Sequence, residues 1–272
     1  MKSVFEILPN AIDAGKCSLV CEVSNEGFSY LIKDSQTDTF TGLGVYHYNT
    51  IVPGNHVTEL QKILTKQELA SENFLKVNVI YSFSESVLIP FSLYSSRNNA
   101  EALSMIHGDF TPGDVILTDV LLDKKVYNCY RMSPEITREI GNKFPSVEAL
   151  HQYSFLIKNL SPKGNKLSVI FYPQKIVVTA EKEGELILIN TFHYKTPEDV
   201  SYTLLNICRQ LEIKNMPLQV SGLIEKDSAL FKEIYKYFDP VSFTGLPEGT
   251  KFSEEMNEYP AHFFSHLFAI NS

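Results

Sequence analysis

The amino-acid sequence predicts a mixed α/β protein built from two related halves. The first observation is a repeat: residues 167–196 have a weaker copy at residues 19–50, and the copies end in Thr-Phe-His-Tyr-Lys-Thr and Val-Tyr-His-Tyr-Asn-Thr. The second is that each copy has the pattern of three strands followed by a helix. The third is that another apolar strand follows each of these helices. Together they predict one structural plan used twice.

In the first half, residues 19–23, 28–33 and 40–48 are predicted strands, and the first two are joined by a turn with glycine at its end. Three antiparallel strands cannot bury an apolar face alone, so a helix is expected to cover them. Val57, Leu60, Ile63 and Leu64 have the spacing of that helix. Residues 75–83 are the predicted fourth strand, and residues 1–16 a lead-in strand or loop.

Further elements are predicted between the fourth strand and the middle of the chain. They are a strand at 87–94, a helix at 98–107 between Asn98 as N-cap and Gly108, a hairpin of 115–122 with 126–132, a helix that starts at Ser133-Pro134-Glu135 and ends near Gly141, and a helix from Ser146 to about Asn159. Residues 161–165, Ser-Pro-Lys-Gly-Asn, are the most linker-like segment and are the predicted boundary between the halves.

The second half repeats the order of the first. Its predicted strands are 167–171, 176–180, 186–194 and 218–224, with a short strand at 241–243. Thr196-Pro197-Glu198-Asp199 predicts a helix start, because it combines a capping hydroxyl, proline at the first helical position and acids at the positive end of the dipole. A helix at 228–238 and a tail, 253–268, that is helical in two pieces broken at Pro260 complete the half.

An antiparallel meander followed by a helix and a further strand implies a mixed five-stranded sheet with helices on its faces. This is the ribonuclease-H-like unit, and two such units in tandem form a two-lobed actin-like ATPase fold. We predict a first lobe over residues 1–160, with an inserted strand and helix segment at about 87–145, and a second lobe over residues 161–272. The C-terminal helix could pack back on the first lobe.

Composition excludes several classes of function. The chain is 44% hydrophobic and 21% charged, as globular proteins are, and its net charge of −8 argues against binding nucleic acid or anionic lipid. No apolar run approaches the roughly 20 residues that a membrane-spanning helix needs. The four cysteines form no Cys-x-x-Cys pair, and the apolar run at residues 4–8 ends at Pro9, unlike a secretion signal. These features predict a cytoplasmic protein with reduced cysteines.

The sequence resembles a bacterial family of unknown function, seen mainly in Bacteroidetes, that is associated with an actin-like ATPase fold. The resemblance spans nearly the whole chain and is clearest at residues 192–202, 204–211, 218–230 and 259–268. These are fold-level patterns without a diagnostic catalytic motif. A looser resemblance is to the actin-like pilus-assembly and cell-division proteins, which implies ATP binding and the docking of short partner peptides as properties to test.

An actin-like ATPase normally opens each half with an Asp-x-Gly turn whose backbone N–H groups close on phosphate. The first turn here reads Glu22-Val23-Ser24-Asn25-Glu26-Gly27, with an acid and a glycine at a different spacing. The second, Phe-Tyr-Pro-Gln-Lys at 171–175, has neither, and its proline removes a donor. On the adenosine side, only Gly222 matches the family's pair of glycines. The candidate cofactor-binding residues are therefore Glu22, Asn25, Gly27 and Gly222.

Other features that could carry chemistry have simpler interpretations. His107-Gly108-Asp109 fits a helix end, where histidine favours the negative end of the dipole and glycine caps it. His262 and His266 have the i, i+4 spacing of a metal pair, but neighbouring phenylalanines favour a packed helix. No catalytic residue and no metal ligand is assigned.

Three functions follow from this pattern. The leading hypothesis is a non-catalytic actin-like protein that needs no cofactor and binds a protein partner, or a small ligand, in or near the cleft between the lobes. The alternative is a divergent ATP-binding protein or ATPase of the actin-like superfamily, with ATP and Mg²⁺ as cofactors. A ribonuclease-H-like nuclease would need clustered carboxylates for two metal ions, which the sequence favours least. The sequence does not predict the partner or the oligomeric state.

Overall fold

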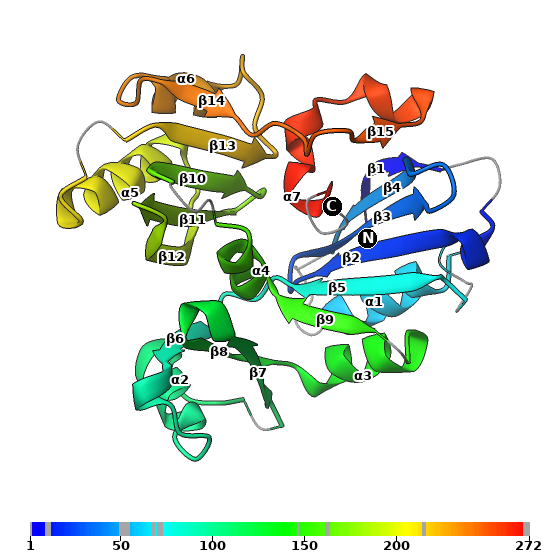
Figure 1. The fold of residues 1–272 in the computed structure, drawn as a ribbon, viewed down its shortest axis with the longest axis horizontal. Coiled ribbons are helices and arrows are strands. Elements are labelled where there is room, and N and C mark those ends of the chain that lie inside the picture. The colour runs from blue at the N-terminus through cyan, green and yellow to red at the C-terminus, as the bar shows by residue number, and fades with distance from the viewer. Residues whose placement is uncertain are drawn as a thin grey trace. The chain divides into compact units, whose positions relative to one another are not determined.

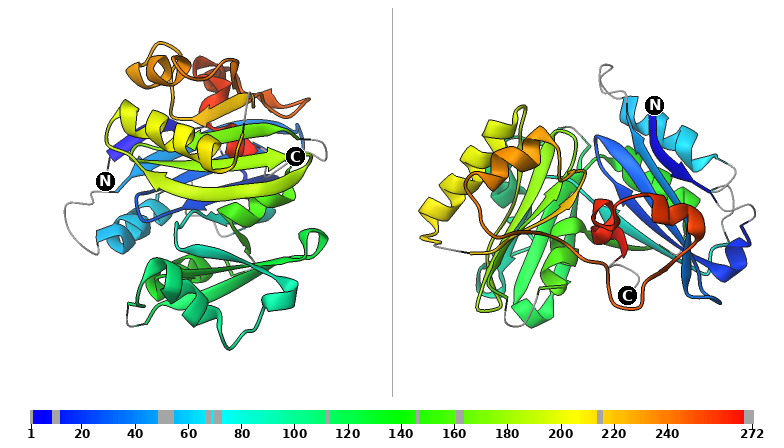
Figure 2. Two further views of the ribbon diagram at one scale, coloured as in Figure 1. Left: turned by 90° about the vertical axis from the view of Figure 1, so that its left-hand side faces the viewer. Right: turned by 90° about the horizontal axis from the view of Figure 1, so that it is seen from above.

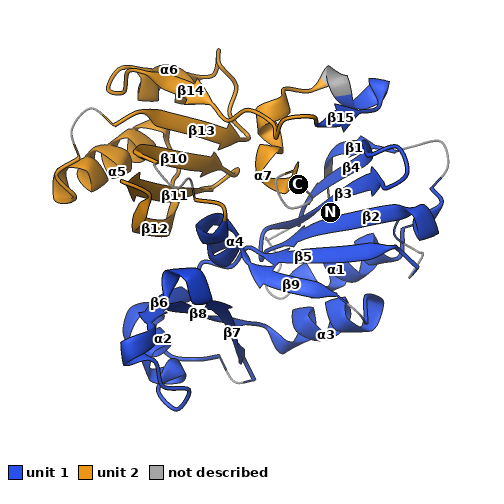
Figure 3. Cartoon of the chain, in the orientation of Figure 1, with its two compact units in different colours: residues 1–158, 250–258 blue, residues 159–249, 259–272 orange. Residues whose placement is uncertain are grey.

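The chain folds into two compact units, coloured separately in Figure 3. The computed structural model describes residues 2–8, 12–48, 55–66, 69, 73–111, 113–145, 147–160, 164–213 and 216–268. Unit 1 consists of Met1–Lys158 and Thr250–Glu258, and unit 2 of Asn159–Gly249 and Tyr259–Ser272. Unit 1 therefore includes a short segment that follows residues 159–249 of unit 2 in the sequence.

Unit 1 is organised around a mixed sheet with strand order β1-β4-β3-β2-β5-β9 (Figure 1). The β2–β3–β4 meander is antiparallel, β5 is parallel to β2, and β9 is parallel to β5. A further strand, β15, pairs in parallel with the start of β4. The strands are β1 (Lys2–Ile7), β2 (Cys17–Val23), β3 (Gly27–Asp34), β4 (Thr39–His47), β5 (Lys76–Tyr81), β9 (Glu148–His151) and β15 (Lys251–Phe252).

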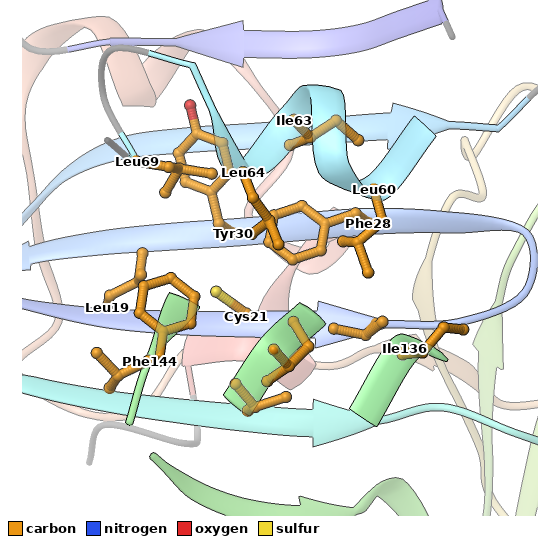
Figure 4. Packing of buried hydrophobic residues seen from close by; sticks show 14 of the residues in the cluster. Leu19, Cys21, Phe28, Tyr30, Leu60, Ile63, Leu64, Leu69, Ile136 and Phe144 are labelled. Carbon is orange, nitrogen blue, oxygen red and sulfur yellow. The ribbon is translucent and has the colours of Figure 1, made fainter. Parts of the chain in front are cut away.

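Helices cover this sheet and complete its core. They are α1 (Asn55–Leu64), α3 (Pro134–Lys143), α4 (Gln152–Lys158) and the 3₁₀ turns η1 (Ala14–Lys16) and η5 (Glu254–Glu258). Central strand β2 reads Cys-Ser-Leu-Val-Cys-Glu-Val and is buried along nearly its whole length, as a strand covered on both faces should be. Figure 4 shows Leu60 and Ile63 of α1 in the same cluster as Phe28 and Tyr30 of β3. The predicted apolar spacing of α1 thus faces the core.

An inserted three-stranded sheet lies between β5 and α3 in the sequence, with the antiparallel order β6-β8-β7 (Figure 1). Helix α2 contacts β6 and β8, and α4 contacts β7. Asn98 and Gly108 occupy the predicted N-cap and C-cap positions of α2, although the Asn98 side chain makes no capping hydrogen bond. The inserted elements are β6 (Ser86–Pro90), η3 (Phe91–Leu93), α2 (Asn99–His107), β7 (Val115–Leu121), η4 (Leu122–Lys124) and β8 (Val126–Met132).

Unit 2 is a five-stranded sheet with the order β12-β11-β10-β13-β14. Strands β10, β11 and β12 form an antiparallel meander, while β13 and β14 run parallel to β10. Its core joins α5 and α6 to the sheet. The elements are β10 (Lys166–Phe171), β11 (Lys175–Lys182), β12 (Glu185–His193), α5 (Pro197–Gln210), β13 (Leu218–Gly222), α6 (Ala229–Tyr235), β14 (Val241–Phe243), η6 (Ala261–Phe263) and α7 (Ser265–Phe268).

The same plan is used in both units. The order β4-β3-β2-β5-β9 in unit 1 corresponds strand for strand to β12-β11-β10-β13-β14 in unit 2, and each meander is followed by a helix. His47 ends β4, and His193 ends β12. The predicted fold of two ribonuclease-H-like units is confirmed.

Two predicted helices differ from the structure. The helix expected from Ser146 to about Asn159 is wrong in its first part, because residues 148–151 form β9, and α4 begins only at Gln152. The parallel pairing of β9 with β5 overrides the helical preference of Glu-Ala-Leu. Ser146 itself lies outside the described residues. The tail, predicted as two helices, forms two 3₁₀ turns and a four-residue helix. Among the described residues, no helix is long and apolar enough to span a membrane.

Candidate functional site

In sheets with parallel strands, ligands bind outside the carboxyl ends of the strands. In unit 1, Val23, Tyr81 and His151 are the last residues of β2, β5 and β9, and the register aligns them at one edge. The segments that leave this edge are the β2–β3 turn, the connection that begins at Ser82, and helix α4. This edge is therefore the candidate functional site of unit 1.

A buried chain of polar side chains joins these three segments. Ser82 Oγ donates to Gln152 Oε1 at 3.0 Å, and Gln152 Nε2 donates to Glu22 Oε1 at 3.4 Å. All three side chains are buried. The structure thus places the predicted site residue Glu22 beside two residues that the sequence analysis did not identify. Because the Glu22 carboxylate is buried and hydrogen-bonded, it is held in one position at the strand ends.

His151 connects this edge to the inserted sheet. Its Nε2 donates to the carbonyl of Phe83 at 2.8 Å, and its Nδ1 accepts from the backbone N–H of Tyr153 at 3.1 Å, so the neutral tautomer with the proton on Nε2 satisfies both nitrogens. The backbone N–H of His151 donates to Asp119 Oδ2 at 2.8 Å. Asp119 belongs to β7 and also accepts from the hydroxyl of Tyr130 in β8, at 3.3 Å.

Asp119 is a carboxyl of this network whose pKa departs from its ordinary value. Burial raises its pKa above the ordinary value, although hydrogen bonds from Ser154, His151 and Tyr130 act in the opposite direction. Beside it, Asn128 of β8 donates to Ser154 Oγ in α4 at 2.8 Å and accepts from Ser86 Oγ in β6. The inserted sheet is thus attached to α4 through buried, mutually satisfied polar groups, which fix their positions.

The first predicted phosphate turn is closed on itself. Ser24 Oγ accepts from the backbone N–H groups of Glu26 and Gly27, both at 3.1 Å, and Ser24 N donates to the carbonyl of Gly27 at 3.0 Å. Asn25 is exposed at the tip. A phosphate-binding turn needs N–H groups that point to the ligand. In this turn, a side chain already occupies two of them.

Gly27 has a structural role of its own. A Cβ at this position would lie 2.3 Å from the carbonyl oxygen of Tyr46 on β4. The β3–β4 pairing therefore needs glycine here, whether or not a ligand binds.

The corresponding turn of unit 2 is also closed. Tyr172 N donates to the carbonyl of Lys175 at 2.9 Å, and the hydroxyl of Tyr194 donates to the carbonyl of Tyr172 at 2.7 Å. Pro173 supplies no N–H. Gly222 ends β13 with φ of +79°, and a Cβ there would lie 2.3 Å from the carbonyl oxygen of Phe171. Gly222 thus lets β13 approach β10 closely. It belongs to unit 2, whereas Glu22, Asn25 and Gly27 share one hairpin of unit 1.

The histidines considered from the sequence pack against their own units. His107 lies in the last turn of α2, where Nε2 donates to the carbonyl of Ser86 at 3.1 Å. His262 Nε2 donates to the carbonyl of Ile224 at 2.7 Å, and its ring centroid lies 4.1 Å from that of Phe243. In the described ranges, no three His, Cys, Asp or Glu side chains are grouped so that they could hold a metal ion.

The strand order and pairing of the two units define the actin-like ATPase fold. A protein of unknown function from Bacteroides thetaiotaomicron VPI-5482 with this fold is similar over 91% of this chain and 98% of its own, with a TM-score of 0.74 and 19% identity. The chain belongs to the family described as Protein of unknown function (DUF3822), whose model matches residues 9–241.

A second solved structure is similar at the level of the fold. The PilM-PilN type IV pilus biogenesis complex contains a chain that matches 93% of this one and 98% of its own length, with a TM-score of 0.58 and 8% identity. A comparison with curated protein sequences finds no match.

Proposed function

We propose that this protein acts by binding a protein partner, and that its strand-end turns no longer bind nucleotide phosphate. The observation that carries the proposal is the hydrogen bonding of the first turn, where Ser24 Oγ accepts from Glu26 N–H and Gly27 N–H. A phosphate would have to displace these bonds, and the second turn has a proline where a donor is needed. A partner or small ligand in the cleft between the halves, predicted from the fold, stays a prediction.

An exposed apolar cluster on the inserted sheet supports partner binding. Leu93, Val120 and Leu122 are exposed at the end of this sheet where β7 turns into β8. Val120 is paired across the strands with Tyr127, whose ring stacks on that of Tyr94 with 3.6 Å between the centroids. Exposed apolar side chains around a rigid aromatic group are typical of sites that bind proteins. In the PilM-PilN complex, a protein of similar fold is assembled with another protein.

Calorimetric titration with ATP and Mg²⁺ tests the first half of this proposal. We expect no saturable heat up to about 1 mM nucleotide, which corresponds to binding weaker than about −4 kcal/mol. Ser24→Ala removes the hydroxyl that accepts from the two N–H groups, so this variant tests whether these hydrogen bonds prevent phosphate binding. Ser95→Ala in the inserted segment is its control. A dissociation constant below about 10 μM for the unaltered protein would overturn the proposal and support the ATP-dependent alternative.

The second half is tested by photo-crosslinking in cells. A photoreactive residue at Leu122 should give one discrete crosslinked product, whose partner is identified by mass spectrometry and then purified. The partner should bind the unaltered protein and bind the Leu122→Ser variant at least about tenfold more weakly, the size expected for a buried anchor. A photoreactive residue at exposed Glu185 of β12 is the control. Equal crosslinking from both positions would contradict the proposed surface.

We also propose that the protein is located in a reducing compartment, the cytoplasm. Its four cysteines, Cys17, Cys21, Cys129 and Cys208, are free thiols, and the first three are buried. Buried free thiols suit a compartment in which disulfides do not persist.

A further inference from the structure

Helix α5 has an exposed apolar stripe on the side opposite to its buried apolar stripe. Val200, Leu204 and Ile207 are buried in the core of unit 2. On the opposite side, Tyr202 is 71% exposed and Leu205 is 39% exposed. In Figure 2, left, α5 (yellow) lies in front of the strands of unit 2, so this side points away from the sheet. The core of unit 2 buries only one side of α5, so the apolar stripe on its solvent-exposed side is available for binding another molecule.

Charged residues stand at the two ends of this stripe. Glu198 lies four residues before Tyr202, and Arg209 lies four residues after Leu205, so all four side chains fall within one narrow sector of the helix. Both charged residues are exposed. Arg209 also donates to Asn206 Oδ1 at 2.9 Å, which keeps its guanidinium on the helix surface. We call Glu198, Tyr202, Leu205 and Arg209 the α5 stripe.

The α5 stripe is self-complementary. Glu198 and Arg209 are equally far from the midpoint between residues 203 and 204, and so are Tyr202 and Leu205. Two copies related by a two-fold axis at this midpoint would place each Glu198 against the partner's Arg209, and each Tyr202 against the partner's Leu205. A parallel alignment would instead place Glu198 against the partner's Glu198 and Arg209 against the partner's Arg209. The charges therefore select the antiparallel arrangement, which is the isologous geometry of a two-fold dimer.

Helix α6, the neighbour of α5 in unit 2, also carries exposed aromatic side chains. It packs against α5, and Tyr235 at its end and Tyr237 just after it are 55% and 53% exposed. Tyrosine is enriched at protein interfaces, where a large rigid ring contributes contact area at little entropic cost. One pair of packed helices is a small interface, so the association of two copies should depend on protein concentration in the micromolar range.

We propose that the α5 stripe is a homodimerisation surface, on which the α5 helices of two copies of this chain pack antiparallel. The occupant is a second copy because the stripe complements itself in charge and in the positions of its apolar side chains along the helix. This inference is independent of the partner proposed for the inserted sheet, since it uses a different surface in a different unit.

Charge exchange on the full chain tests the pairing, with sedimentation equilibrium as the measurement. Glu198→Arg faces the partner's Arg209 with a like charge, and Arg209→Glu does the same to Glu198, so each variant alone should dimerise at least about tenfold more weakly than the parent protein. An equimolar mixture of the two variants should form a heterodimer, because each then meets its opposite charge. The double variant should dimerise within about threefold of the parent protein.

The mixture also separates lost pairing from lost folding, since a misfolded variant could not be rescued by another. Tyr202→Ser should weaken the dimer by about tenfold or more, and Glu185→Arg on β12 makes the same charge change as Glu198→Arg but outside the stripe, so it should have no effect. A parent protein that stays monomeric at about 100 μM would overturn the proposal and would indicate that the α5 stripe binds a different protein. A dimer unchanged by Glu198→Arg, or no recovery in the mixture, would overturn it as well.

Discussion

Gly222 is a residue whose identity can be explained without a ligand. It combines φ of +79° with a Cβ position only 2.3 Å from the carbonyl oxygen of Phe171. Gly249 has nearly the same φ, +80°, but open space around its Cβ position. Substitutions at these two glycines therefore distinguish the free-energy cost of a positive φ from the free-energy cost of the close contact with Phe171.

We expect Gly222→Ala to destabilise the protein more than Gly249→Ala does. The left-handed conformation costs a non-glycine residue roughly 1–2 kcal/mol in both variants. The contact with the Phe171 carbonyl should add about 1–3 kcal/mol in the first variant only. Urea denaturation followed by circular dichroism measures both free energies of unfolding. Equal losses would show that β13 and β10 tolerate a wider separation, and a ligand would again be the better explanation of Gly222.

At the scale of one element, α5 shows how sequence determines a helix start. Thr196 accepts from Asp199 N–H, and the Asp199 carboxylate accepts from the N–H groups of Lys195 and Thr196 at 2.9 Å each, which completes the predicted capping box. These backbone hydrogen bonds lower the pKa of Asp199 below its ordinary value. The same helix carries the α5 stripe.

A pH series tests this cap. Because the folded-state pKa of Asp199 is lowered, its ionised form stabilises the fold above the ordinary pKa of about 3.9, and this contribution is lost as the pH falls through the folded-state value. Asp199→Ala should therefore lower the stability at pH 7, with a difference from the parent protein that shrinks toward pH 3. Urea midpoints across the series measure it, with Thr196→Ser, which keeps the capping hydroxyl, as control. A difference that does not change with pH would contradict the cap as its cause.

Elements with local signals could be predicted from the sequence, and those that depend on distant partners could not. The helix starts at Thr196 and Ser133, the apolar run that forms β5 and the apolar spacing of α1 are local signals, and each is found in the structure. Residues 148–151 alone do not predict strand β9, because the strand depends on its pairing with β5, which lies far away in the sequence.

The candidate site has the same limit. Glu22 could be named because it lies in a recognisable turn, but Gln152 is 130 positions away from it and 70 from Ser82. Nothing in the local sequence joins these three residues. Only the parallel alignment of β2, β5 and β9 brings the strand ends together.

For the whole molecule, the segment Thr250–Glu258 matters more than its length suggests. It returns to unit 1 after residues 159–249 of unit 2, and β15 within it pairs with residues 39–40 of β4. The ring of Phe252 lies 6.1 Å from that of Phe40, which is buried. We expect Phe252→Ala to loosen β4 locally, because the cover of Phe40 is lost.

Hydrogen exchange measured by mass spectrometry checks this expectation. Peptides that contain the first half of β4 should exchange at least about tenfold faster in the Phe252→Ala variant, equivalent to about 1.4 kcal/mol of local stability. Peptides from β10 and β13 in unit 2 are the internal control and should not change. Unchanged exchange in β4 would show that β15 contributes nothing to the stability of unit 1.

The return of Thr250–Glu258 to unit 1 also has a consequence for biosynthesis. A ribosome adds residues from the N-terminus onward, and domains generally fold as they emerge. Strands β1 to β9 can assemble early, but the start of β4 keeps an open edge until β15 has been translated, after residues 159–249 of unit 2. During that interval the nascent chain presents backbone donors and acceptors that another polypeptide could pair with, so completion of unit 1 depends on a segment that is made only after residues 159–249.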